Sequence, residues 1–168
     1  MTSSQAQDLC TACGMCCDGT MFGAVPVEEH ERSRLSAIFD LETTDGTTTF
    51  RQPCPQNQCH RCQVYDLRPS SCRGYRCLTL KALDAGEIDI DEGARRIAEV
   101  LKAREAVRAM MLPGETLTAA RLRRKDLAAD ASRLPAATGF ILALTALDLL
   151  LDRYVREQDL QMFKAGVS

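Results

Sequence analysis

The second half of the chain, from about residue 81, carries apolar residues at helical spacing. This pattern predicts three helices, over residues 89–112, 118–134 and 139–163. The expected N-terminal caps are Asp89 or Asp91, Thr118 and Thr138. Pro113-Gly114 ends the first helix, and Pro135 interrupts the chain before the third.

The third segment is the most apolar part of the chain. Its apolar character is nearly all-round between Phe140 and Leu151, so we expect it to be the central helix of a small bundle. That run also contains Asp148 and is too short to cross a bilayer. In the first helix, the expected buried stripe consists of Ile97, Val100, Leu101, Val107, Met110 and Met111.

The first half of the chain shows little helical periodicity. Residues 21–27 are expected to form a short strand, which Pro26 places at a sheet edge. Residues 28–39 have the apolar spacing of one helix. Asp45-Gly46 is a hairpin turn signal, and residues 47–50 suit the strand that follows it.

Residues 53–77 differ from the rest of the chain because they are dense in Cys, Pro and Arg and offer little apolar surface to bury. A metal site can order such a segment. The expected fold class is therefore α+β. A small irregular cysteine-rich metal-binding region over residues 1–80 is expected to carry a C-terminal helical bundle, residues 81–168, packed on it.

Composition narrows the possible functions. A net charge of −2, an aromatic content of 5% and the lack of Trp give no clear nucleic-acid signal. The basic run Arg121–Lys125 is expected to be an exposed helix face, compensated by Asp126 and Asp130. Residues 1–8 are polar and lack the features of a secretory signal, so we expect a cytoplasmic protein with no membrane partner.

Cysteine is the outlier in this composition. So many thiols need either an oxidising compartment or a metal. Their odd number, in a chain without a visible secretory signal, favours metal ligation over a closed set of disulfides. The nine cysteines all precede residue 78: Cys10, Cys13, Cys16, Cys17, Cys54, Cys59, Cys62, Cys72 and Cys77.

The first cysteine cluster is Cys10-Thr-Ala-Cys13-Gly-Met-Cys16-Cys17. Gaps of two residues let a tight backbone loop turn successive thiolates onto one ion. The same spacing occurs in the three-ligand run of cubane iron–sulfur sites, whose distant fourth Cys is followed by Pro. Cys54 is followed by Pro55, so the pattern leaves both zinc and an iron–sulfur cluster open.

The second cluster holds the remaining five cysteines, from Cys54 to Cys77. Because tetrahedral zinc takes four thiolates, the chain has enough of them for two such sites. We expect about half of the neighbouring arginines to donate hydrogen bonds to sulfur, and the rest to be solvated. These arginines are Arg51, Arg61, Arg68, Arg73 and Arg76.

Across residues 8–80 the order of cysteines, with the segment Cys62-Gln-Val-Tyr65-Asp-Leu-Arg68-Pro69-Ser-Ser-Cys72-Arg73, resembles the CxxCxxCC family of zinc- or iron-chelating domains. More distantly, the pattern is similar to that of flagellin lysine N-methylases, which are thought to use an iron–sulfur cluster. The resemblance implies eight metal ligands: Cys10, Cys13, Cys16, Cys17, Cys54, Cys62, Cys72 and Cys77.

Several assignments stay open at this point. Cys59 departs from the family pattern, and His60 is either a further ligand or a solvated side chain. Tyr65 is expected to be a packing anchor, and Arg68 a donor to nearby carbonyls or to Asp66. No catalytic residue stands out. Beyond metal binding, the role is that of a structural zinc protein, an iron–sulfur enzyme of redox or methyl-transfer chemistry, or a metal carrier or redox sensor.

Overall fold

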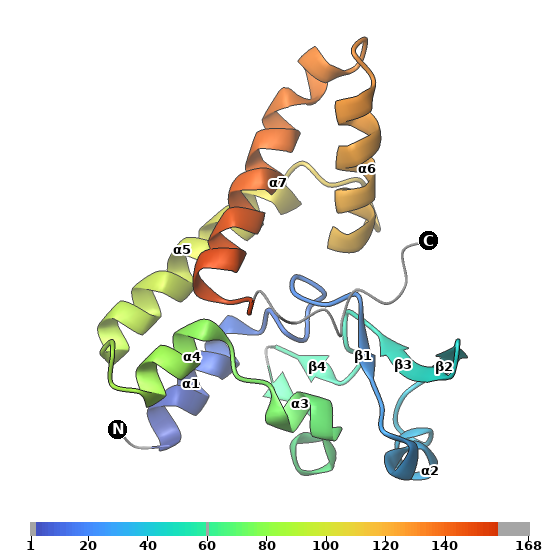
Figure 1. The fold of residues 1–168 in the computed structure, drawn as a ribbon, viewed down its shortest axis with the longest axis vertical. Helices are drawn as coiled ribbons and strands as arrows, with labels where there is room; N and C mark the ends of the chain where they lie inside the picture. Colours follow the sequence, from blue (N-terminus) through green and yellow to red (C-terminus); the bar gives the residue numbers. More distant parts are fainter. Residues whose placement is uncertain (1–2, 60, 158–168) are drawn as a thin grey trace. The chain divides into compact units, whose positions relative to one another are not determined.

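The computed structural model describes residues 3–59 and 61–157. They fold into α+β structure, which confirms the predicted class (Figure 1). Contacts divide the chain into two compact units. Among the described residues, the helical unit combines residues 3–13 with residues 77–157, and the small unit comprises Gly14–Arg76. The predicted division into domains at residue 80 stays a prediction.

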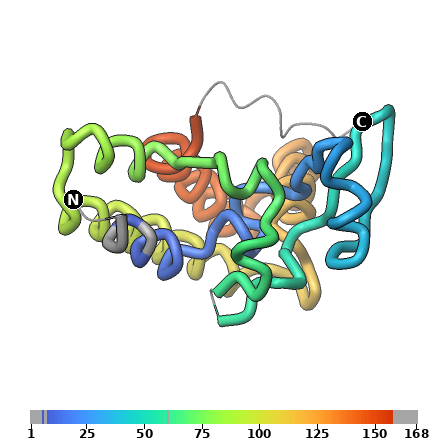
Figure 2. Tube along the Cα trace, turned by 90° about the horizontal axis from the view of Figure 1, so that it is seen from below, coloured from blue at the N-terminus to red at the C-terminus, as the bar shows by residue number. Residues whose placement is uncertain are grey.

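In the helical unit, α7 is the central helix, as expected, because it packs on both α5 and α6 (Figure 1). Figure 2 shows α1 and α4 next to α5, with a turn that carries the chain from α4 into α5. The helices of this unit are α1 (Ser3–Cys13), α4 (Leu78–Asp84), α5 (Ile90–Arg108), α6 (Leu117–Ala129) and α7 (Leu134–Tyr154).

The start of α5 is the one that the sequence predicted. Asp89 is its N-cap, and the carboxylate accepts a hydrogen bond of 2.8 Å from the amide of Glu92. The predicted cap of α6 is wrong by two residues. Thr116, rather than Thr118, accepts from the amide of Ala119 at 3.2 Å.

The start of α7 is also earlier than predicted. Pro135 lies in its first turn, where a missing backbone N–H costs nothing, so it begins the helix instead of separating it from α6. Thr138 is not a cap, because it lies inside the helix and its hydroxyl donates to the carbonyl oxygen of Leu134 at 2.9 Å. The predicted continuation over residues 158–163 lies outside the described residues.

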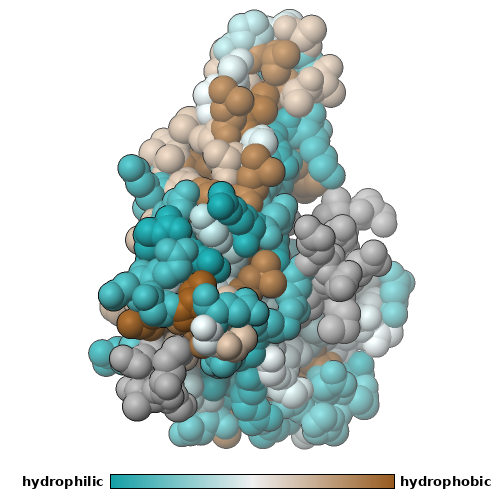
Figure 3. Space-filling view, turned by 60° about the vertical axis from the view of Figure 1, so that its left-hand side comes forward, coloured by the Kyte–Doolittle hydropathy of each residue, from teal (hydrophilic) through white to brown (hydrophobic). Residues whose placement is uncertain are grey.

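At 21 residues, with a mean hydropathy of 1.9 over its most apolar 18 residues, α7 is long and apolar enough to cross a membrane, although the sequence pattern suggested a shorter run. The central helix of a helical bundle can be equally long and apolar, and α7 packs on two neighbouring helices, α5 and α6. Only 28% of its most apolar window is buried. Leu142 and Leu149 are 63% and 65% exposed, and apolar residues are visible where α6 and α7 lie in the upper part of Figure 3.

Two expectations about buried and exposed side chains are wrong in the helical unit. Met110, expected in the core, is 41% exposed because it lies beyond the end of α5. Arg121 and Arg124, expected on an exposed face, are mostly buried and form ion pairs of 3.0 Å with Asp148 of α7. The carboxylate that these two arginines share therefore comes from another helix, α7, where Asp126 and Asp130 of their own segment were expected.

The small unit contains an antiparallel sheet with strand order β1-β3-β2. Asp45 and Gly46 have φ values of 50° and 78°, as a two-residue hairpin turn between β2 and β3 requires, which confirms the turn prediction. The predicted helix over residues 28–39 is shorter than expected. The elements up to this point are β1 (Ala24–Pro26), η1 (Glu29–Glu31), α2 (Arg32–Leu35), β2 (Leu41–Thr44) and β3 (Thr47–Arg51).

A hydrophobic core stabilises the small unit, and the cysteine-rich segment takes part in it. The rings of Phe39 and Phe50 stack with centroids 4.2 Å apart. Cys54, Val64 and Cys72 pack against this core, so residues 53–77 bury more apolar surface than the sequence suggested. The segment forms β4 (Asn57–Gln58), β5 (Arg61–Cys62), η2 (Tyr65–Leu67) and α3 (Ser70–Gly74).

Candidate metal centre

Three of the cysteines belong to the helical unit. Cys10 and Cys13 lie on α1 and not in the tight loop that their spacing predicted. An interval of three residues on a helix places both on one face. Cys77 is the N-cap of α4. Burial is the main factor that raises the pKa of the Cys77 thiol, and the nearby Cys10 thiol raises it further.

In the small unit, a turn at Gly14, which has a φ of 63°, leads into Cys16 and Cys17. The amide of Cys17 donates to the carbonyl oxygen of Gly14 at 2.9 Å and so closes this turn. The carbonyl oxygen of Cys17 in turn accepts a hydrogen bond of 2.8 Å from the amide of Cys54. The last cysteine of the first cluster and the first of the second cluster therefore lie side by side.

Cys54, Cys62 and Cys72 form a thiol cluster at the edge of the small unit's core. Cys62 lies on β5 and is paired in register with Asn57 of β4. Asn57 follows Cys54 by three residues, so the pairing brings Cys62 back toward Cys54. Cys72 lies in the middle of α3. Burial raises the pKa of the Cys72 thiol to about 12, with further contributions from Cys54 and Cys62. The pKa of Cys54 is raised by burial and by Cys62.

Two charged side chains act on this thiol cluster. Arg68 lowers the pKa of Cys72, and Glu31 raises it, both by less than burial does. The Arg68 Nε donates to the carbonyl oxygen of Tyr65 at 2.9 Å, which confirms its predicted role as a backbone donor. Its guanidinium lies 3.6 Å from the centroid of the Tyr65 ring. Tyr65 itself is 42% exposed, so it is not the expected packing anchor.

Two of the other arginines have carboxylate partners in the small unit. Arg51 pairs with Glu42 at 2.9 Å, and Arg73 lies 3.5 Å from the carboxylate of Glu31. Cys59 is exposed in the turn between β4 and β5, where its φ of 48° is left-handed. Its neighbour His60 lies outside the described residues, so the expectation that it could be a ligand stays a prediction.

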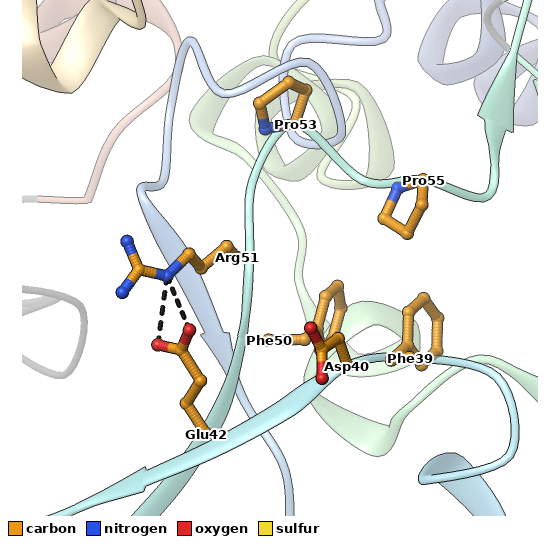
Figure 4. A pocket seen from close by; sticks show the side chains of 7 residues that line it. All are labelled: Phe39, Asp40, Glu42, Phe50, Arg51, Pro53 and Pro55. Carbon is orange, nitrogen blue, oxygen red and sulfur yellow. Dashed lines mark hydrogen bonds and ion pairs between the residues drawn. The ribbon is translucent and has the colours of Figure 1, made fainter.

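A surface pocket of about 190 Å³ is lined by Pro53 and Pro55, the two chain neighbours of Cys54 (Figure 4). Pro53 and Pro55 form one side of it, and the rings of Phe39 and Phe50 form the other. The Arg51–Glu42 pair borders it. The pocket is smaller than the usual site for a small-molecule ligand, and no thiol lines it.

The donors of the thiol cluster suit zinc and iron, because both metals accept thiolate sulfur. All nine cysteines lie in the described part of the chain, and none is in a disulfide there. Within residues 3–59 and 61–157, no group of three Cys, His, Asp or Glu side chains is already close enough to hold a metal ion. The cluster therefore fits a metal in its chemistry, and binding has to draw the sulfurs together.

The protein has an α+β fold with nine cysteines in the first half of the chain, and three of their thiols gather beside the core of the small unit. These features are typical of cysteine-rich metal-chelating proteins. The chain belongs to the CxxCxxCC family, whose model, described as "putative zinc- or iron-chelating domain", matches residues 9–97. The match covers more than half of the 168 residues and extends past residue 80 into α5. No curated protein and no solved structure gave a match.

Proposed function

We propose that this protein binds zinc or iron through the thiolates of the patterned cysteines, in a reducing compartment such as the cytoplasm. The supporting observation is the clustering of Cys54, Cys62 and Cys72: the Cys62 thiol raises the pKa of both Cys54 and Cys72, and the Cys54 thiol raises that of Cys72. The proposed ligands are the eight that the family pattern includes: Cys10, Cys13, Cys16, Cys17, Cys54, Cys62, Cys72 and Cys77.

The electrostatics of the thiol cluster support a cation as its ligand. Three thiolates close together and partly buried repel one another, and burial disfavours each negative charge. A divalent cation removes both costs, because it bonds to the sulfurs and neutralises them. Because burial raises the pKa of the Cys54 and Cys72 thiols, these two ligands release protons when the metal binds.

The experiment is metal analysis combined with native mass spectrometry of protein purified without oxygen. We expect bound zinc or iron in the folded protein. A colourless preparation with stoichiometric zinc supports a structural site, whereas a brown preparation with charge-transfer absorption supports an iron–sulfur cluster. A folded protein whose mass contains no metal, and which takes up none when zinc or ferrous iron is added, would overturn the proposal.

A further inference from the structure

Glu31 is a buried carboxylate at the end of η1, with only 3% of its side chain exposed. Both of its oxygens accept from the amide of Ser70 at 3.1 Å, and one accepts from the Ser70 hydroxyl at 2.8 Å. Burial alone would raise the pKa of Glu31, but the Ser70 hydrogen bonds and the charges of His30 and Arg34 lower it. The carboxylate is therefore charged at neutral pH.

The partner of this carboxylate is the first residue of α3, the helix that carries Cys72. With five residues, α3 is too short to be stable without outside contacts. Its N-cap is Pro69, which has no side-chain group to cap the first amides. Glu31 supplies that missing acceptor from 39 positions earlier in the chain.

Two further contacts hold the same segment on either side of Ser70. Arg34 donates to the carbonyl oxygen of Leu67 at 2.7 Å and also contacts Glu31 at 3.1 Å. The hydroxyl of Ser71 donates to the carbonyl oxygen of Pro26 in β1 at 2.7 Å. The segment that leads into Cys72 is thus attached both to α2 and to the sheet. Glu31 is the most buried of the residues that hold it.

We propose that Glu31 is a positioning residue, which holds Ser70 and thereby aims Cys72 at Cys54 and Cys62 for metal ligation. This inference rests on the proposed function and assigns a role to a residue that is not itself a ligand. Partners that orient metal ligands typically contribute a factor of about 10–100 to metal affinity.

Charge and position predict opposite effects at Glu31. A carboxylate near thiolates repels them, so removing its charge would by itself strengthen a negatively charged metal–thiolate site. Loss of the Ser70 contacts would instead free α3 and weaken the site. Arg34 and Arg73 lie 3.1 and 3.5 Å from the carboxylate and already offset much of its charge. We therefore expect the positional effect to dominate.

The test measures how fast zinc-loaded protein loses its metal to a chromophoric chelator. Glu31→Gln is compared with Glu29→Gln, the same substitution in the same short helix at a side chain that is 78% exposed. Ser70→Ala removes one contact and keeps the Glu31 charge, and Ser70→Thr restores the hydroxyl. The absorption spectrum of the cobalt(II)-loaded variants reports the number of sulfur ligands, which a purely structural role would leave unchanged.

We expect Glu31→Gln to release zinc about tenfold faster than wild type and to show weaker sulfur-to-cobalt absorption. Ser70→Ala should show a smaller change in the same direction, while Ser70→Thr and Glu29→Gln should match wild type. If wild type binds metal but Glu31→Gln keeps it as long or longer, the positioning role is overturned and the proposed function stands. If wild type binds no metal, the proposed function fails, and the positioning role fails with it.

Discussion

The backbone hydrogen bond of 2.8 Å from the amide of Cys54 to the carbonyl oxygen of Cys17 joins two cysteines that are 37 positions apart (54 − 17). Within the small unit, it places the end of the CxxCxxCC run beside the first thiol of the Cys54, Cys62 and Cys72 cluster. A backbone contact does not depend on the thiols, so this arrangement exists before any metal binds. The cysteine pattern alone did not indicate this link.

Substituting Cys72 should reduce metal binding, and substituting Cys59 should not. Cys72 is half-buried among other thiols, whereas Cys59 is exposed in a turn and outside the family pattern. We expect Cys59→Ser to keep the metal content of wild type and Cys72→Ser to lose metal. Inductively coupled plasma analysis of the two variants decides this. Equal loss in both would show that the assignment of ligands by family position is wrong.

Metal affinity should rise steadily with pH. Protons compete with metal for the thiols, and the pKa of Cys72 without metal is about 12, above its ordinary value of 9.0. The competition therefore persists throughout pH 6.5–8.5, and apparent affinity should increase about tenfold per pH unit for each proton released. Competition titrations with a zinc chelator at several pH values measure this. A plateau near neutral pH would indicate that the ligating thiols are already deprotonated.

Metal removal should loosen the small unit first. The side chains of its cysteine-rich segment that pack against the core, Cys54, Val64 and Cys72, are only partly buried, whereas α5 and α7 form a bundle with fully buried side chains such as Val100 and Leu144. With chelator and reductant, amide hydrogen exchange should increase across residues 14–76 and stay slow in α5 and α7. If protection were lost at the same rate in both units, the chain would be one cooperative domain that depends on metal throughout.

Two leucines of α7 should respond differently to the same substitution. Leu147 is fully buried, so Leu147→Ala should lower the free energy of unfolding by about 2–5 kcal/mol. Leu149 is 65% exposed, and Leu149→Ala should change the free energy of unfolding by no more than about 0.5 kcal/mol. Urea denaturation of the metal-loaded protein measures both, with metal content as the control. A large loss for Leu149→Ala would mean that its apolar face is covered in solution.

Local signals in the sequence were sufficient for several features of this protein. Asp45-Gly46 specifies its hairpin because few residue pairs accept two positive φ angles, and Asp89 specifies the start of α5 because its carboxylate caps an amide three residues away. The cysteine order likewise indicated the family, since spacing along the chain is the property that the motif describes.

The tertiary structure alone decided which distant residues meet. The sequence could not show that Arg121 pairs with Asp148, or that Glu31 holds Ser70, because each pair belongs to different elements and depends on how those elements pack. The same reason applies to Cys54, Cys62 and Cys72. Their residue type predicts metal chemistry, but their proximity follows from the way the β4–β5 hairpin and α3 pack against the core of Phe39 and Phe50.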